Sequence, residues 1–193
     1  MKNNLVVALL GLVIVGGTWL TRSGEQAPVR GGTFLVYDIG GSMMRLTFSP
    51  TGNGEFSTSF EYADEDGKFG TDHLPGTQGD IVDSRMRTAD GRIFELASLG
   101  PLWVPPSEVH EGGSAHGTRI DNVRRWKNWD VGVVTAAMGM GTALRGEWYY
   151  DTRTGFLVGG TKSTAVSGPG QGLVFTLTDS NLPDLDVRSP PAP

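Results

Sequence analysis

The sequence predicts a mainly β protein, in which an N-terminal transmembrane helix precedes an antiparallel β-sheet domain built as a half-barrel or a sandwich. The 193 residues include 29 glycines and 11 prolines, which suits many turns between short strands. A charge-free apolar run opens the chain, and strand-like runs with period-two alternation follow it. A chain of this length can bury one sizeable core, so we expect a single globular domain.

The first element is the apolar run at residues 5–20, which contains no charged side chain. Its length approaches the roughly 20 residues that span a bilayer core, and Trp19 stands where an interfacial aromatic would lie. We expect residues 1–21 to be an uncleaved signal anchor in the cell inner membrane, with a cytoplasmic N-terminus and the bulk of the chain periplasmic or otherwise extracytoplasmic. The side chains expected to contact lipid include Leu5, Leu9, Leu12, Ile14 and Trp19.

A cleaved signal peptide is the alternative for the same segment. Lys2 supplies a positive charge before the apolar stretch, and Val15, Gly16 and Gly17 offer small residues near a cleavage point. The sequence leaves both possibilities open.

Three regions follow the anchor. Residues 22–30 form a polar linker, residues 31–179 form the extracytoplasmic β-domain, and residues 180–193 form a Pro-rich tail expected to be extended or disordered. Within the domain, we expect strands in order along residues 33–38, 43–49, 54–62, 92–98, 130–141, 144–151, 155–166 and 172–179. Residues 63–83 are predicted to be a long loop, and the prolines in residues 99–117 argue against regular structure there.

Two hairpins have the clearest local signals. The runs 33–38 and 43–49 are separated by Ile39-Gly40-Gly41-Ser42, and the runs 148–151 and 155–158 are separated by three residues. In the next run, Phe56 and Phe60 alternate with polar residues, so they should face a core or a partner.

Asp38-Ile39-Gly40-Gly41-Ser42 resembles the first phosphate loop of the actin/hexokinase superfamily. The resemblance implies that Asp38 holds a metal ion and that the chain is a sugar-kinase-like phosphotransferase. Such a kinase also needs a second phosphate loop and long helices, and no such helix is predicted between Asp38 and Asp130. We therefore interpret the match as coincidental, with Asp38 capping a glycine turn, and keep the kinase as a remote alternative.

Tyr150-Asp151-Thr152-Arg153-Thr154-Gly155 resembles the Tyr-Asp-x-x-Thr-Gly hairpin of extracytoplasmic β-half-barrel carrier proteins. The resemblance covers about fifteen residues, counting the flanking strands. It implies a half-barrel with a cavity, and hence a carrier or sensor of an apolar ligand as the alternative function.

Composition excludes several kinds of function. The net charge is -5 and no basic run is present, which argues against a nucleic-acid partner. The absence of cysteine removes disulfides and thiolate chemistry. His110 and His116, with Glu108 and Glu111 nearby, offer metal-ligand types but match no standard spacing. We expect no metal, no cofactor and no catalytic residue, so the protein is predicted not to be an enzyme.

Aromatic and arginine side chains provide the candidate partner-binding residues, because protein interfaces concentrate these types. They are Trp103, Arg124, Arg125, Trp126 and Trp129. Each tryptophan could instead fill the core, and the sequence does not decide between the two. The predicted function is a non-catalytic accessory or scaffolding subunit of a larger membrane complex for energy transduction, secretion or transport, binding other membrane subunits through its β-domain, loops and tail.

Overall fold

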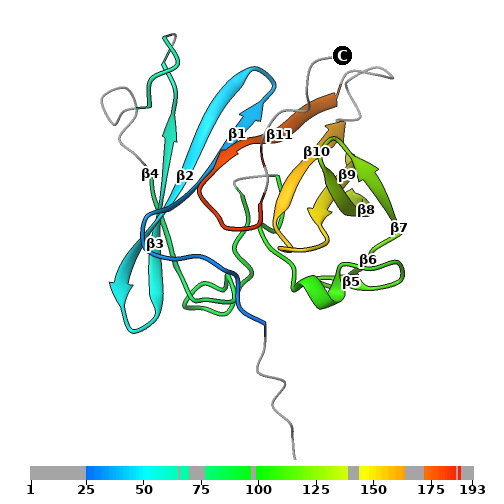
Figure 1. Cartoon of the computed structure of the whole chain (residues 1–193), viewed down its shortest axis with the longest axis horizontal. Coiled ribbons are helices and arrows are strands. Elements are labelled where there is room, and N and C mark those ends of the chain that lie inside the picture. The colour runs from blue at the N-terminus through cyan, green and yellow to red at the C-terminus, as the bar shows by residue number, and fades with distance from the viewer. Residues whose placement is uncertain are drawn as a thin grey trace, which may run out of the picture.

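The computed structural model describes residues 25–64, 66–69, 77–96, 99–138, 144–163, 172–185 and 187 (Figure 1). The expected anchor at residues 1–21 and its lipid-facing side chains lie outside the described residues, as does the start of the linker. In the part of the chain that is described, no helix has the length and apolar character needed to cross a membrane.

Nine strands form one open antiparallel sheet, in the order β4-β3-β2-β1-β11-β10-β9-β8-β7. This confirms the mainly β prediction. The strands of the sheet are β1 (Thr33–Ile39), β2 (Ser42–Gly52), β3 (Glu55–Tyr62), β4 (Thr77–Val82), β7 (Asn122–Trp126), β8 (Trp129–Met138), β9 (Leu144–Asp151), β10 (Leu157–Ser163) and β11 (Gly172–Ser180). A separate small ribbon pairs β5 (Ser114–Ala115) with β6 (Thr118–Arg119), and a single 3₁₀ turn, η1 (Pro106–Glu108), precedes it.

The sheet joins two meanders. Strands β1 to β4 run outward in chain order on one side, and β11 to β7 run outward in reverse order on the other. Their junction is the β1–β11 pair, in which Tyr37 faces Leu177 and Ile39 faces Phe175. Tyr37 also donates a hydrogen bond from its hydroxyl to the Leu157 carbonyl at 2.7 Å. The two ends of the domain sequence therefore meet at the centre of the sheet.

The segment between β4 and η1, residues 83–105, runs between the two halves of the sheet (Figure 1). We call it the connector. It folds as a series of tight turns with isolated bridges, Val82 to Thr88, Arg87 to Ile93, Glu95 to Pro101 and Trp103 to Phe156. Its apolar side chains are buried in the core, among them Met86, Phe94, Leu96, Leu99, Leu102, Trp103 and Val104. This connector therefore supplies much of the core that an open sheet lacks.

Three strand predictions need correction. The run predicted at residues 92–98 forms isolated bridges over its described part rather than a strand of the sheet, because the turns on either side fold it back on itself. Strand β4 lies in the region predicted to be a loop, and β7 was not predicted at all. Both are edge strands whose partners are β3 and β8, so their pairing depends on contacts that local composition does not reveal.

The β1–β2 hairpin forms as predicted. Gly40 and Gly41 have φ values of 62° and 92°, the pair of positive angles that a type I′ turn requires. The Gly41 N–H donates to Oδ1 of Asp38 at 2.8 Å. Asp38 thus caps the turn with its side chain, in agreement with our interpretation of this stretch.

The β9–β10 hairpin also forms as predicted, and a buried carboxylate holds its turn. Oδ2 of Asp151 accepts hydrogen bonds from the Thr154 N–H at 2.9 Å and from the Thr154 hydroxyl at 2.7 Å. The ring N–H of Trp103 donates to the Thr154 carbonyl at 2.9 Å. The connector and this turn are therefore fastened to one another.

The beginning of the Pro-rich tail packs against the domain. The Asn181 side chain accepts from the Phe34 N–H at 2.8 Å and donates to the Gly32 carbonyl at 2.9 Å, which extends the contact with β1. Leu182 and Leu185 are buried in the core. Residues 181–185 thus belong structurally to the domain rather than to a free tail.

Candidate functional site

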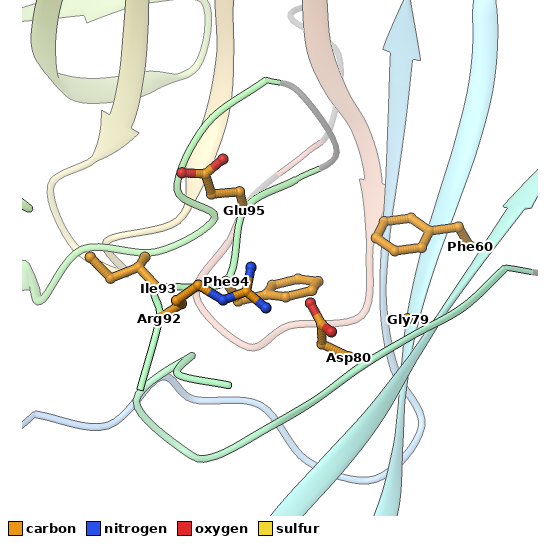
Figure 2. A pocket seen from close by; sticks show the side chains of 7 residues that line it. All are labelled: Phe60, Gly79, Asp80, Arg92, Ile93, Phe94 and Glu95. Atoms are coloured by element: carbon orange, nitrogen blue, oxygen red, sulfur yellow. The ribbon is translucent and has the colours of Figure 1, made fainter. Parts of the chain in front are cut away.

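A hollow of about 640 Å³ lies between strands β3 and β4 and the connector. Figure 2 shows the residues that line it: Phe60, Gly79 and Asp80 come from the strands, and the others come from the facing connector. The lining residues are Phe60, Gly79, Asp80, Arg92, Ile93, Phe94 and Glu95. A hollow of this size is in the range used for small ligands or for side chains of a partner.

A glycine shapes the strand side of this hollow. A Cβ on Gly79 would lie 2.1 Å from the Thr58 hydroxyl oxygen and 3.1 Å from the Phe60 ring. Without that Cβ, β4 lies close enough to β3 for the Thr58 hydroxyl to donate to the Asp80 carbonyl at 3.0 Å. This contact lies at an irregularity in the β3–β4 register and positions Asp80 beside the hollow.

An aromatic pair forms the apolar part of the lining. The rings of Phe60 and Phe94 stack with centroids 6.3 Å apart and planes 24° from parallel. Phe94 is buried, and its backbone is fixed by hydrogen bonds to Met86 and from Leu102. The pair therefore presents a firm apolar wall next to charged groups.

The charged groups of the hollow are predominantly acidic. Arg92 donates from Nε to Oδ2 of Asp90 at 2.5 Å. A hydrogen bond from the Thr88 hydroxyl and this contact with Arg92 lower the pKa of Asp90 to about 2, so Asp90 is ionised at neutral pH. Asp90 and, more weakly, Asp80 and Glu95 raise the pKa of Arg92. Three carboxylates thus act electrostatically on one guanidinium, and one of them, Asp90, is in direct contact with it.

A second and a third hollow, both smaller, follow the first, and each shares lining residues with the one before it. One of about 200 Å³ shares Ile93 and Glu95 with the first and is further lined by residues that include Thr118, Trp148 and Tyr150. Another of about 360 Å³ shares His116 with the second and extends to Arg85, Arg87, Glu25 and Glu108. We call these three adjoining spaces the row of hollows.

His116 stands where the second and third hollows meet. Its Nε2 lies 2.7 Å from the Trp103 carbonyl oxygen, so in the neutral ring Nε2 carries the proton and donates. Burial lowers the pKa of His116 below its ordinary value of 6.5, Arg87 adds to the decrease, and the Trp103 carbonyl and Glu95 oppose it. The folded protein therefore favours the uncharged ring.

This lowered pKa predicts that His116 makes the protein less stable in acid. The unfolded chain takes up the proton near pH 6.5 while the folded chain resists it, so the free energy of unfolding falls as the pH decreases through that value. We expect the stability difference between the native protein and His116→Asn to shift against the native protein from pH 8 to about pH 5.5. Urea unfolding at several pH values measures this difference.

The replacement suits the site because His116 has a φ of 51°, a conformation that asparagine tolerates. His110→Asn, on the exposed loop, is the control for loss of a histidine. A stability difference that does not change with pH would contradict the prediction.

The predicted partner-binding residues fall in two places. Arg124, Arg125, Trp126 and Trp129 come together at the β7–β8 hairpin, whereas Trp103 lies in the connector, in the core. Trp103 and Trp129 are 2% and 3% exposed, so their side chains are packed in the core. Of the two possibilities that the sequence left open for these tryptophans, the structure shows burial in the core.

At the hairpin, the other three residues remain accessible. Trp126 is half-buried, with its ring 4.7 Å from that of Tyr149 and 5.7 Å from that of Trp129. Arg124 is exposed and pairs with Glu147 at 2.8 Å, and Arg125 is exposed and lies 3.3 Å from Asp130. Their binding of a partner stays a prediction.

The histidines and acids considered as metal ligands do not converge. His110 contacts the Glu111 carbonyl oxygen, and His116 contacts that of Trp103. Across the described residues, no group of three or more histidine and acidic side chains could hold a metal ion.

The main hollow was not predicted from the sequence. The alternation of Phe56 and Phe60 did indicate that Phe60 faces inward, but β4 was taken for a loop and residues 92–95 for part of a strand. A useful signal was the glycine before Asp80, since a glycine inside a strand can mark a close approach of two backbones.

Comparison with protein-family models, with curated proteins and with solved structures finds no match for this chain.

Proposed function

We propose that this protein is a non-catalytic accessory or scaffolding subunit of a membrane complex, held at the inner membrane by residues 1–21 with its β-domain on the extracytoplasmic side. The complex would serve energy transduction, secretion or transport. In this proposal the curved sheet acts as a half-barrel, and partner subunits bind to it on the side where the connector lies. The expected contacts of Arg124, Arg125 and Trp126 would add a second point of attachment at the β7–β8 hairpin.

The observation that carries the proposal is the row of hollows. It begins at β4, passes Ile93 and Glu95, and continues past His116. Its lining comes from β3, β4, the connector, η1, the β5–β6 ribbon and the sheet strands β8 and β9, with Glu25 before β1. A small molecule occupies a single cleft or cavity, whereas an extended polypeptide segment uses a sequence of neighbouring subsites. An extended segment of a partner subunit therefore fits this arrangement better than a compact ligand does.

A photoreactive amino acid placed at Ile93 or at Thr118 tests the proposal in native membranes. Ile93 is half-buried and lines the first and second hollows, and Thr118 lines the second. We expect irradiation to produce the same protein adduct from both positions. Val174, which is 53% exposed on β11 and lines none of the three hollows, is the control.

Absence of a protein adduct from both positions would overturn the subunit proposal, and so would an identical adduct from Val174. The N-terminus of the adduct also tests the anchor. A chain that keeps residues 1–21 supports it, whereas a chain that begins near Thr18 indicates a cleaved signal peptide.

The carrier of an apolar ligand remains the second candidate, because the first hollow has the volume of a small-molecule site. The exposed carboxylates of Asp80 and Glu95 in its lining oppose a purely apolar ligand. Irradiation would then attach a molecule of small mass to Ile93 and no protein. The remote kinase alternative requires the Asp38 carboxylate to hold a metal ion. That carboxylate accepts a hydrogen bond from the Gly41 N–H and caps the turn, which does not favour this alternative.

A further inference from the structure

Strand β4 ends the sheet on the side of the 640 Å³ hollow. It is the last strand in the sheet order, so within the described structure no further strand pairs with its outer side. Val82 is already bridged to Thr88, which leaves the part of the edge before Val82, beside Gly79 and Asp80. An edge of this kind offers backbone donors and acceptors to an incoming extended segment.

The hollow beside this edge has carboxylates on both sides. Asp80 stands on β4 and Glu95 on the facing connector, and both side chains are exposed (Figure 2). Neither carboxylate forms a hydrogen bond with another described residue, whereas the one cation of the lining, Arg92, is paired with Asp90. Asp80 and Glu95 also act electrostatically on Arg92, and the three charged side chains of the lining together carry a net negative charge.

The aromatic pair adds the second recognition element. A lysine or arginine side chain has an apolar stem and a cationic end, and such a stem packs against aromatic rings while the end stays with carboxylates. Phe60 and Phe94 supply the rings, and Asp80 and Glu95 supply the carboxylates. The lining thus matches both parts of one basic side chain.

We propose that the hollow binds a basic side chain from an extended segment of the partner protein, which adds to the sheet along the free edge of β4. This inference rests on the proposed function and specifies its chemistry. Backbone pairing with β4 would hold the segment, and the row of hollows would receive side chains further along it. A free amine of small size would fill the first subsite and leave the edge and the other hollows unused.

Fluorescence anisotropy with two labelled hexapeptides tests the proposal on the full-length chain in mild non-ionic detergent. One peptide alternates valine and lysine, the other alternates valine and glutamate, and both favour extended structure. We expect the lysine peptide to bind and the glutamate peptide not to bind. Added salt should weaken the binding, because exposed charge pairs are screened.

The double variant Asp80→Asn, Glu95→Gln should bind the lysine peptide about tenfold more weakly, since two charge-assisted contacts are lost with little change of shape. The control pair Asp179→Asn, Glu111→Gln removes the same charge from exposed positions that do not line the hollow. It should bind as the native chain does. Equal weakening in the two double variants would refute the proposal, because it would show attraction to the overall net charge of -5.

Two further outcomes are decisive. Absence of binding by the lysine peptide at millimolar concentration would refute the proposal. If acetyl-lysine amide alone competes as well as the hexapeptide, a small amine is the occupant and pairing with β4 is refuted.

The experiments distinguish failure of the proposed binding of a basic segment from failure of the proposed subunit role. If Ile93 still forms its protein adduct in membranes carrying the Asp80 and Glu95 variants, the subunit proposal stands without this chemistry. If the lysine peptide binds but no protein adduct forms in native membranes, the chemistry stands and the subunit proposal fails.

Discussion

Replacement of Gly155 by alanine is expected to cost about 3–5 kcal/mol of unfolding free energy, a large part of the stability of an ordinary domain. Gly155 has a φ of 74°, and an added Cβ would lie 1.8 Å from the Val104 carbonyl oxygen and 3.1 Å from the Trp103 ring nitrogen. The oxygen belongs to a backbone that is itself fixed, because the Val104 N–H donates to the Gly155 carbonyl at 2.9 Å. The clash can be relieved only by separating the connector from the β9–β10 turn.

Urea unfolding followed by far-ultraviolet circular dichroism measures this loss, and Gly91→Ala is its matched control. Gly91 has a similar φ of 79°, but a Cβ there meets no atom within 4 Å. Its replacement carries the backbone strain alone, about 1 kcal/mol. If the two variants lose equal stability, the close approach of Val104 to the turn is not a feature of the folded protein.

Replacement of Trp103 by alanine is expected to cost about 3–5 kcal/mol, since a fully buried tryptophan leaves a large cavity. Trp103 is 2% exposed, and its ring N–H is hydrogen-bonded to the Thr154 carbonyl. Removal leaves that buried carbonyl without its donor as well as opening the core. Circular dichroism is the suitable probe, because the substitution itself alters tryptophan fluorescence.

Trp126→Ala separates this core role from a surface role. Trp126 is half-buried on the β7–β8 hairpin and rests over Gly159, where a Cβ would lie 2.3 Å from its ring. Its loss should cost clearly less, roughly 1–2 kcal/mol, because part of the ring already contacts water. A loss as large as that of Trp103→Ala would contradict the assignment of Trp126 to the surface.

The sequence alone was sufficient wherever a few neighbouring residues determine the structure. Two glycines after Asp38 have the backbone freedom for a tight hairpin, and Asp151 followed by Thr154 and Gly155 specifies the turn between β9 and β10. These interactions span three or four residues, so their chemistry is visible in the order of the residues. The mainly β character follows from the same local signals.

Which tryptophans are buried could be determined only from the tertiary structure. Trp126 and Trp129 are three residues apart in the same hairpin, yet one is half-buried and the other is in the core. Trp103 is buried because the connector runs beneath the β9–β10 turn, a contact between residues about 50 positions apart. No local pattern distinguishes a core tryptophan from an interface tryptophan, since both are apolar and aromatic.

The sequence by itself determined the mainly β character, the two tight hairpins, the acidic balance and the lack of cysteine chemistry. Only the tertiary structure decided that β1 pairs with β11, that β4 and β7 form the edges, and that Asp80 faces Glu95 across a hollow. The physical reason is that turn geometry is set by backbone angles of adjacent residues. Strand partners and the hollow instead depend on which distant segments bury the most apolar surface together.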